Sequence, residues 1–286
     1  MPEPLVQVPL RVFLDPSYWS WRWPVLLVLS WFAGSVVVGT LRLWRGRGRN
    51  RWPLRRSVWL GFGLGGLKLA LLSPLDALGG AVFSWHMVQH LALLYAAPLV
   101  LAGRPFPAVL WSLPRPARAA LGRALRPGGT LRRIFAAMTS PVGGLTAGTL
   151  SLWIWHYPPL YDAVLTRRWL HDLEHVTFFA GALLYWWPVT EAPPVRRIRS
   201  DAVRTLYLVL GGLQSGLLGA LVTFWPGVLY HRYLLETVDP VRVQADQVFG
   251  GLVMWLSGPI VVTLAALATL GREVARVAEV EELPPH

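Results

Sequence analysis

The 286-residue sequence contains no cysteine. This absence excludes disulfide bonds and thiolate metal sites, so any metal ion must be bound by His, Met or carboxylate side chains. Charged residues are also scarce, at 15% of the chain, whereas hydrophobic residues make up 54%. Soluble domains have a larger charged share and a smaller apolar share. The composition therefore indicates an integral membrane protein.

A signal-peptide pattern is also missing from the amino terminus, which reads MPEPLVQVPLRVFLDPSYWSWRWP. A cleavable signal would show a basic region, then a short apolar core, then a cleavage site of small residues. These features do not follow one another here, so no cleavable signal peptide is expected.

Long apolar runs, in contrast, occur along most of the chain. A membrane-spanning helix needs about 20 mostly apolar residues. Segments that approach this length lie at 24–44, 57–76, 83–103, 138–156, 171–190, 203–224 and 247–270. The sequence thus predicts an all-α, polytopic transmembrane helical bundle of about seven spans. The predicted parts are an outer segment at 1–23, a transmembrane domain at 24–270 and a cytoplasmic tail at 271–286.

The formal net charge of +12 comes mostly from arginine in the connections between these segments. Arginines gather in the first, third and fifth connections, and the other connections hold few. Because cytoplasmic loops of membrane proteins are rich in Lys and Arg, this bias predicts the N-terminus outside and the C-terminus in the cytoplasm. The charge is a topology signal, and no binding to nucleic acid is expected.

Two histidine pairs stand near the predicted outer ends of membrane segments. His86 and His90 occur in HMVQH, and His171 and His175 occur in HDLEH. On a helix, residues four apart stack on one face about 6 Å from each other, so each pair can converge on one ion or one polar cavity. Neutral imidazole avoids most of the cost of burying a charge, and it is also the form that binds metal.

Each of the further candidate ligands has two interpretations, a structural role or a role as a metal ligand. His156, in WIWHYPPLYD, is a helix cap or a ligand, whereas His231 is expected in a loop. Asp246 opens the last predicted span, where it either caps the helix N-terminus or binds metal. Met87 and Met254 are soft ligands suited to Cu(I), although most membrane methionines serve packing.

Ligand chemistry narrows the identity of the metal. His with Met favours copper, whereas His with carboxylate favours zinc, iron or manganese. The Irving–Williams order makes Cu(II) the strongest competitor for imidazole. Copper is therefore expected first, and zinc is the alternative ion.

Three stretches resemble the polytopic cytochrome c oxidase assembly factor CtaG family, which is associated with caa-type oxidases. They are HMVQHLALLYAAPLVLAGRP, WHYPPLYDAVLTRRWLHDLEHVTFFAGALLYWWPV and ADQVFGGLVMW. A different assembly protein with the same name is a single-span copper chaperone with a Cys-x-Cys site, which the absence of cysteine excludes. The resemblance implies a functional role for the residues of this sequence that match the family's motifs. They are His86, Met87, His90, His156, Asp162, His171, Glu174, His175, Asp246, Gln247 and Met254.

The resemblance implies a multi-pass protein of the bacterial plasma membrane that is needed to make active cytochrome c oxidase, by handling copper for its metal centres. We predict a non-enzymatic factor that binds copper at an outward-facing site and delivers it. The predicted core ligands are His86, His90, His171 and His175, and the additional candidates are Met87, His156, Asp246 and Met254. The predicted partners are cytochrome c oxidase subunits, copper donor proteins and the lipid bilayer.

Three other functions are compatible with the same residues. A metal-dependent membrane enzyme, of the zinc hydrolase or di-iron type, would use a metal-bound water or oxygen. A haem-binding electron carrier would need one axial histidine from each of two helices, such as His90 and His175. A scaffold that holds an oxidase subunit would use the histidines only for hydrogen bonds between helices.

Overall fold

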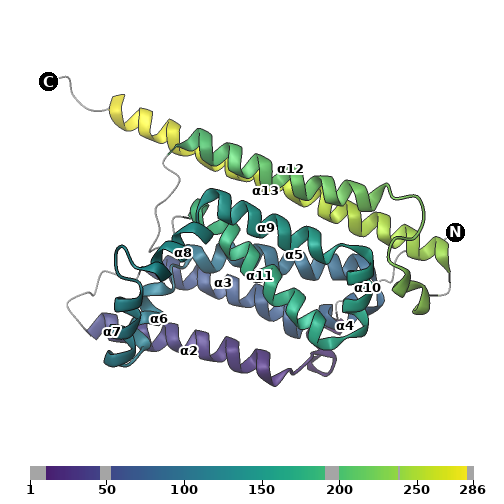
Figure 1. Cartoon of the computed structure of the whole chain (residues 1–286), viewed down its shortest axis with the longest axis horizontal. Helices are drawn as coiled ribbons and strands as arrows, with labels where there is room; N and C mark the ends of the chain where they lie inside the picture. Colours follow the sequence, from purple (N-terminus) through teal and green to yellow (C-terminus); the bar gives the residue numbers. More distant parts are fainter. Residues whose placement is uncertain (1–10, 46–52, 191–199, 238, 282–286) are drawn as a thin grey trace.

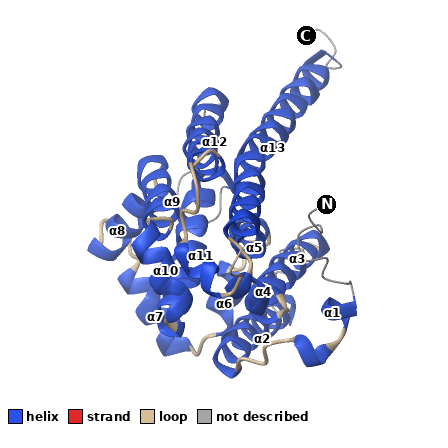
Figure 2. Cartoon of the chain, turned by 90° about the vertical axis from the view of Figure 1, so that its right-hand side faces the viewer, coloured by secondary structure: helices blue, strands red, loops and turns tan. Residues whose placement is uncertain are grey.

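The computed structural model describes residues 11–45, 53–190, 200–237 and 239–281. Within these ranges the regular structure is helical and no strand occurs (Figure 2). The predicted all-α fold class is therefore confirmed. Residues 1–10 of the predicted outer segment and 282–286 of the predicted tail lie outside the described ranges.

The described elements follow one another along the chain with short connections. In order they are α1 (Arg11–Leu14), η1 (Pro16–Tyr18), α2 (Trp23–Arg45), α3 (Leu54–Leu72), α4 (Leu75–Ala81), α5 (Phe83–Ala102), α6 (Phe106–Ser112), α7 (Arg115–Ala124), α8 (Thr130–Met138), α9 (Pro141–Trp155), α10 (Pro158–Thr166), α11 (Arg168–Thr190), α12 (Asp201–Thr223), η2 (His231–Leu235) and α13 (Pro240–Glu281).

Three of these helices are long and apolar enough to cross a membrane. Helices α2, α5 and α12 have windows of mean hydropathy 2.0, 1.3 and 1.6. Helices α3 and α4 together form a fourth candidate, with a bend of 45° between them. The described chain thus contains three or four candidate spans, in keeping with a helical membrane protein.

The predicted segment at 57–76 is not one continuous helix. Helix α3 ends at Leu72, and α4 begins at Leu75. Pro74 lacks a backbone N–H, and its ring excludes the preceding residues from a regular helix. The Ser73 hydroxyl supports the break, since it accepts a hydrogen bond from the Leu75 N–H at 3.2 Å. The bend places Asp76 in the first turn of α4, where it is buried.

The last long helix begins earlier than predicted. Helix α13 starts at Pro240, and the Asp239 carboxylate accepts hydrogen bonds from the N–H groups of Val241, at 3.0 Å, and Arg242, at 3.4 Å. Proline in the first helical position after an aspartate is a usual helix start. The prediction that Asp246 opens this helix is therefore wrong, because Asp246 lies almost two turns inside it.

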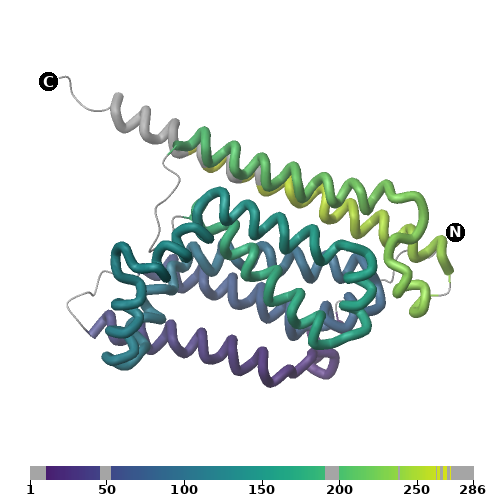
Figure 3. The backbone as a smooth tube through the Cα atoms, viewed as in Figure 1, coloured from purple at the N-terminus to yellow at the C-terminus, as the bar shows by residue number. Residues whose placement is uncertain are grey.

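The long helices run side by side, and α5 lies in the middle of them (Figure 1). Helix α5 packs against α3, α11 and α13, and α11 also packs against α9. The antiparallel pair α12 and α13 lies along one side of the other helices (Figure 3). Half of the spanning window of α5 is buried, against 17% of that of α2. The helix with two of the candidate histidines is therefore at the centre of the bundle.

Close contact between α3 and α5 depends on a glycine. A Cβ atom at Gly63 would lie 2.7 Å from Cγ2 of Val100 and 2.9 Å from its backbone nitrogen. Small residues at helix crossings allow backbones to approach in this way. The Gly-dense stretch GFGLGGLKLALL thus brings α3 against the central helix.

The two ends of the bundle differ in character. Helices α4 and α10 and the start of α13 lie at one end, whereas the arginine-bearing helices α7 and α8 lie at the other (Figure 1). His86, His90, His171 and His175 lie in the first halves of α5 and α11. Both helices begin at the end where α4 and α10 lie, so the histidines and the arginine-rich connections are separated along the bundle.

Candidate metal site

The predicted histidine pairs face each other across α5 and α11. His86 and His90 share a hydrogen bond of 2.9 Å between their Nε2 atoms. The ring centroid of His86 lies 5.5 Å from that of His171 and 6.3 Å from that of His175, and the His90 and His175 centroids are 5.7 Å apart. All four side chains are buried, with at most 7% of their surface exposed. The four residues thus form one cluster.

Glu174 lies among these histidines. Its two carboxylate oxygens lie 3.5 Å from the Nε2 atoms of His86 and His90, and none of its surface is exposed. Residue spacing could have identified it, because positions three and four after His171 share its helix face. The sequence pointed to Glu174 only through the family resemblance. The geometry makes it as central to the cluster as the histidines.

Ligand atoms from four residues approach one another closely enough for one ion. Single atoms from His86, His171, Glu174 and His175 all lie within 4.8 Å of one another. Metal–ligand bonds to imidazole nitrogen and carboxylate oxygen are about 2.0–2.2 Å long. The four ligand atoms would therefore have to move somewhat closer together for one ion to bind all of them.

Several atoms of the cluster have no hydrogen-bond partner among the described residues. They are Nδ1 of His90, Nε2 of His156, Nδ1 of His171, both ring nitrogens of His175 and both carboxylate oxygens of Glu174. Buried polar atoms in folded proteins are nearly always hydrogen-bonded, and an unpartnered one costs about 1–3 kcal/mol. This concentration of free donor atoms fits a metal ion as the missing partner.

His156 joins the cluster from a third element. It is the C-cap residue of α9, as its position before two prolines predicted, and its ring centroid lies 6.0 Å from that of His90. Its Nδ1 lies 2.8 Å from the carbonyl oxygen of Leu152, to which it donates a hydrogen bond. This bond fixes the tautomer and leaves the Nε2 lone pair free, the arrangement that orients histidine ligands.

Aromatic residues of η2 and α10 close the other side of the cluster. The Tyr233 hydroxyl donates to the Gly79 carbonyl at 3.0 Å and lies 3.4 Å from Nδ1 of His86. Burial raises the pKa of Tyr233 well above its ordinary value, so its phenol stays protonated. His231, in the same 3₁₀ helix, is exposed, as expected for a loop position. Sequence patterns did not single out Tyr233.

Charged side chains form ion pairs at the start of α11, next to His171. Arg168 forms an ion pair with Asp76 at 2.8 Å, and Asp76 also accepts a hydrogen bond from Gln89 at 3.3 Å. Arg22, just before α2, pairs with Asp172. These contacts link α2, α4, α5 and α11 over the cluster and hold their ends together.

Asp246 and Gln247 contact backbone groups and not the histidines. The Asp246 carboxylate accepts a hydrogen bond from the Ser84 N–H at 3.2 Å, in the first turn of α5. Gln247 donates to the carbonyls of Val222 and Gly227 and accepts from the Leu229 N–H at 2.6 Å. Asp246 thus caps α5 and not its own helix. Asp162 has a similar role, since it accepts from the Arg232 N–H at 3.2 Å.

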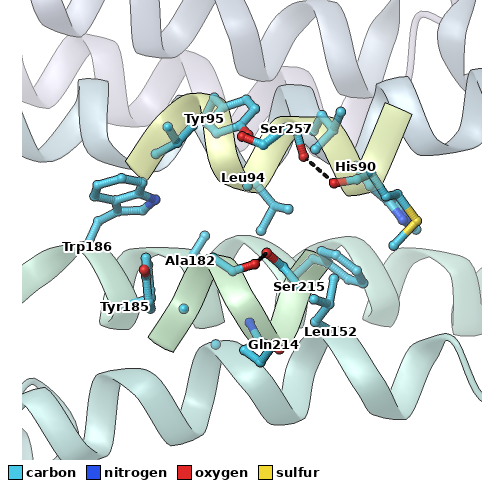
Figure 4. A pocket seen from close by; sticks show the side chains of 18 of the residues that line it. His90, Leu94, Tyr95, Leu152, Ala182, Tyr185, Trp186, Gln214, Ser215 and Ser257 are labelled. Atoms are coloured by element: carbon cyan, nitrogen blue, oxygen red, sulfur yellow. Dashed lines mark hydrogen bonds between the residues drawn. The ribbon is translucent and has the colours of Figure 1, made fainter. Parts of the chain in front are cut away.

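The two candidate methionines lie in the apolar core next to the histidine cluster. Met87 and Met254 are buried in one apolar cluster with Phe83 and Phe178. With His90 and His156 they line a cavity between the helices (Figure 4). The structure therefore brings five histidines and Glu174 together, puts the two methionines beside them, and leaves Asp246 in a capping role.

Comparisons with known proteins identify the family of the chain. Residues 37–276 match the family described as cytochrome c oxidase caa3 assembly factor, Caa3_CtaG. Uncharacterized proteins of Mycobacterium leprae, Mycobacterium bovis and Mycobacterium tuberculosis are 26%, 27% and 27% identical over 90% of this chain. The chain spans 39% of the length of these relatives. No solved structure matches it significantly. Because the family match extends over most of the 286 residues, the chain belongs to the cytochrome c oxidase caa3 assembly factor family.

Proposed function

We propose that this protein takes up copper from the outer side of the membrane and delivers it to a caa3-type cytochrome c oxidase during assembly. The observation that carries the proposal is the buried cluster of five histidines around Glu174, where several donor atoms have no hydrogen-bond partner in the described part of the chain. A purely structural cluster would satisfy those atoms, because leaving each unpaired is costly. The cargo ion supplies the missing partner.

The choice of copper rests on ligand chemistry together with family membership. Imidazole binds Cu(II) more strongly than other divalent first-row metals, and the family assembles an oxidase. The carboxylate of Glu174 also suits zinc or iron, which is why the metal-dependent enzyme is the second candidate. A haem would need open space for its porphyrin plane between His90 and His175, whereas Glu174 and His86 lie directly beside His90. An ion suits this packing better.

The proposed membrane arrangement has seven spans in the bacterial plasma membrane, with the N-terminus outside. Beyond α2, α5, α12 and the pair α3–α4, it includes α9, α11 and α13 as spans. Each coincides with one of the predicted apolar segments, and all run along the same direction (Figure 1). In this orientation the metal site opens outward, where a copper donor protein can meet it, and oxidase subunits contact the chain within the membrane.

Elemental analysis and a visible spectrum of the detergent-purified protein test the proposal. We expect about one or two copper ions per chain, which should be lost in a His90→Ala/His175→Ala variant that keeps its helical circular dichroism. The matched control is His231→Ala, which removes an exposed histidine outside the cluster and should keep the metal.

A different metal content or spectrum would favour one of the other functions. Stoichiometric zinc or non-haem iron would favour the metal-dependent enzyme, and a Soret band would favour the haem carrier. A protein that holds no metal and cannot be loaded would leave only a scaffold. Retention of copper in the double variant would contradict the assignment of the site.

A further inference from the structure

A cavity of about 110 Å³ lies between α5, α9, α11, α12 and α13. His90 stands at one end of it, and Tyr185 and Trp186 stand at the opposite end (Figure 4). Most of the wall is apolar or aromatic. The cavity thus extends from the histidine cluster into the space between the α12–α13 pair and the other helices.

Two of the four methionines of the chain line this cavity. Met87 comes from α5 and Met254 from α13, and both are buried, with 0% and 6% of their surface exposed. Met138, in contrast, lies on the surface at 47% exposure. Thioether sulfur is a soft ligand that prefers Cu(I). The two buried thioethers therefore line the same cavity, although they are 167 positions apart in the sequence.

Two histidines with free ring nitrogens line the cavity as well. His90 and His156 are more than nine-tenths buried, and Nδ1 of His90 and Nε2 of His156 have no hydrogen-bond partner within the described chain. The hydrogen bond from Nδ1 of His156 to Leu152 keeps the free Nε2 lone pair available. Two imidazoles and two thioethers are a softer set than the three imidazoles and one carboxylate around Glu174.

We infer that the cavity holds a second metal site, specific for monovalent copper and formed by Met87, Met254, His90 and His156. It deepens the proposed function, on which it rests, by giving the cargo a position inside the bundle. His90 connects the two sites, because its Nε2 faces His86 and Glu174 whereas its other nitrogen has no partner among the described residues. The transferred ion is Cu(I) in both sites, since imidazole binds copper in this state as well, so no electron donor is involved.

Binding of Ag⁺ and Zn²⁺ to the purified full chain tests this second site. Ag⁺ is a redox-inert stand-in for Cu(I), and Zn²⁺ reports on the site that contains Glu174. A Met87→Leu/Met254→Leu variant roughly conserves volume. We expect it to bind Ag⁺ at least about tenfold more weakly and Zn²⁺ with unchanged affinity. Met138→Leu is the matched control and should bind both ions as the wild type does.

The outcomes separate this inference from the proposed function. Ag⁺ binding that is unchanged in the double methionine variant would overturn the second site. Equal loss of both ions would also overturn it, since the methionines would then act through packing. If the wild type binds Ag⁺ through the methionines but binds no Zn²⁺, the inference stands and the site around Glu174 fails. X-ray absorption of the Cu(I)-loaded wild type should show sulfur bound to copper, and its absence would contradict the inference.

Discussion

The two ends of the helix bundle use polar side chains in opposite ways. At the end where α5 and α11 begin, five histidines and Glu174 are buried, and many of their atoms lack partners within the described ranges. At the other end the arginines of α7 and α8 are mostly exposed. Burial combined with missing partners, and not polarity by itself, therefore distinguishes the end at which we propose that a ligand binds.

Arginines at the second end already have partners within the chain. Arg42 donates hydrogen bonds to the carbonyls of Trp111 and Ser112, at 3.0 Å and 2.8 Å, and so caps the C-terminus of α6. The guanidinium of Arg118 stacks on the ring of Trp111 at 4.2 Å. Contacts of this kind hold short helices in place at a membrane surface. The fold alone therefore explains the positions of the Arg42 and Arg118 side chains.

The largest expected effect comes from labelling the two ends in intact cells. Because the chain has no cysteine, each introduced cysteine is the single reactive thiol. Tyr157→Cys, at the histidine end, should react with a membrane-impermeant maleimide, whereas Arg123→Cys, at the arginine end, should react only after permeabilisation. Tyr157 and Arg123, the latter on α7, are both exposed. Labelling of both positions without permeabilisation, or of Arg123→Cys alone, would contradict the proposed orientation.

Replacing the central carboxylate should have the next largest effect. Glu174→Gln keeps the size of the side chain and removes its charge, so we expect Zn²⁺ and Cu²⁺ to bind at least about 100-fold more weakly. Competition with a chromophoric chelator measures the affinity. Glu236→Gln is the matched control, because Glu236 pairs with Arg232 at the surface. An affinity in Glu174→Gln equal to that of the control would remove Glu174 from the site.

A smaller effect is expected for a residue that supports the site from outside and does not belong to the histidine cluster. Arg168→Ala leaves the buried carboxylate of Asp76 with Gln89 as its remaining side-chain partner among the described residues, and Asp76 has 4% of its side chain exposed. We expect a loss of about 1–3 kcal/mol in the free energy of unfolding, less than for a fully buried pair because Arg168 is half exposed. Denaturation in mixed micelles measures it.

The control for Arg168→Ala is Arg242→Ala at the start of α13. Arg242 pairs with Asp239 at 3.3 Å, and both side chains are about half exposed. Exposed pairs contribute at most about 1 kcal/mol, so Arg242→Ala should have little effect. Equal destabilisation by the two changes would indicate that the Asp76 pair does not support the site.

The long helices could be predicted from the sequence because apolar length is a strong signal. Helices α7 and α8 were missed, because they are short and arginine-rich, and such stretches resemble loops. The bend at Pro74 and the start of α13 at Pro240 were also missed, although in both cases a proline marks the change. Apolar length alone is insensitive to such local boundaries.

The candidate site was predictable in its members but not in its assembly. Spacing of four residues paired His86 with His90 and His171 with His175, and the structure keeps both pairs. The two pairs meet because α5 packs against α11. The spacing of residues within one helix does not predict which helices pack together. The sequence suggests Asp246 as a cap of its own helix, whereas it caps α5, a contact between residues 162 positions apart that only the fold reveals.

The bend between α3 and α4 has a consequence for how fast an ion could be exchanged. Helix α4 lies directly on the start of α5, since a Cβ atom at Gly79 would be 3.1 Å from Cα of His86. The Tyr233 hydroxyl fastens α4 through the Gly79 carbonyl. Helix α4, of seven residues, thus closes one side of the histidine cluster together with Tyr233. If the proposed ion leaves on this side, its rate of release depends on the packing of α4 as well as on the strength of the metal–ligand bonds.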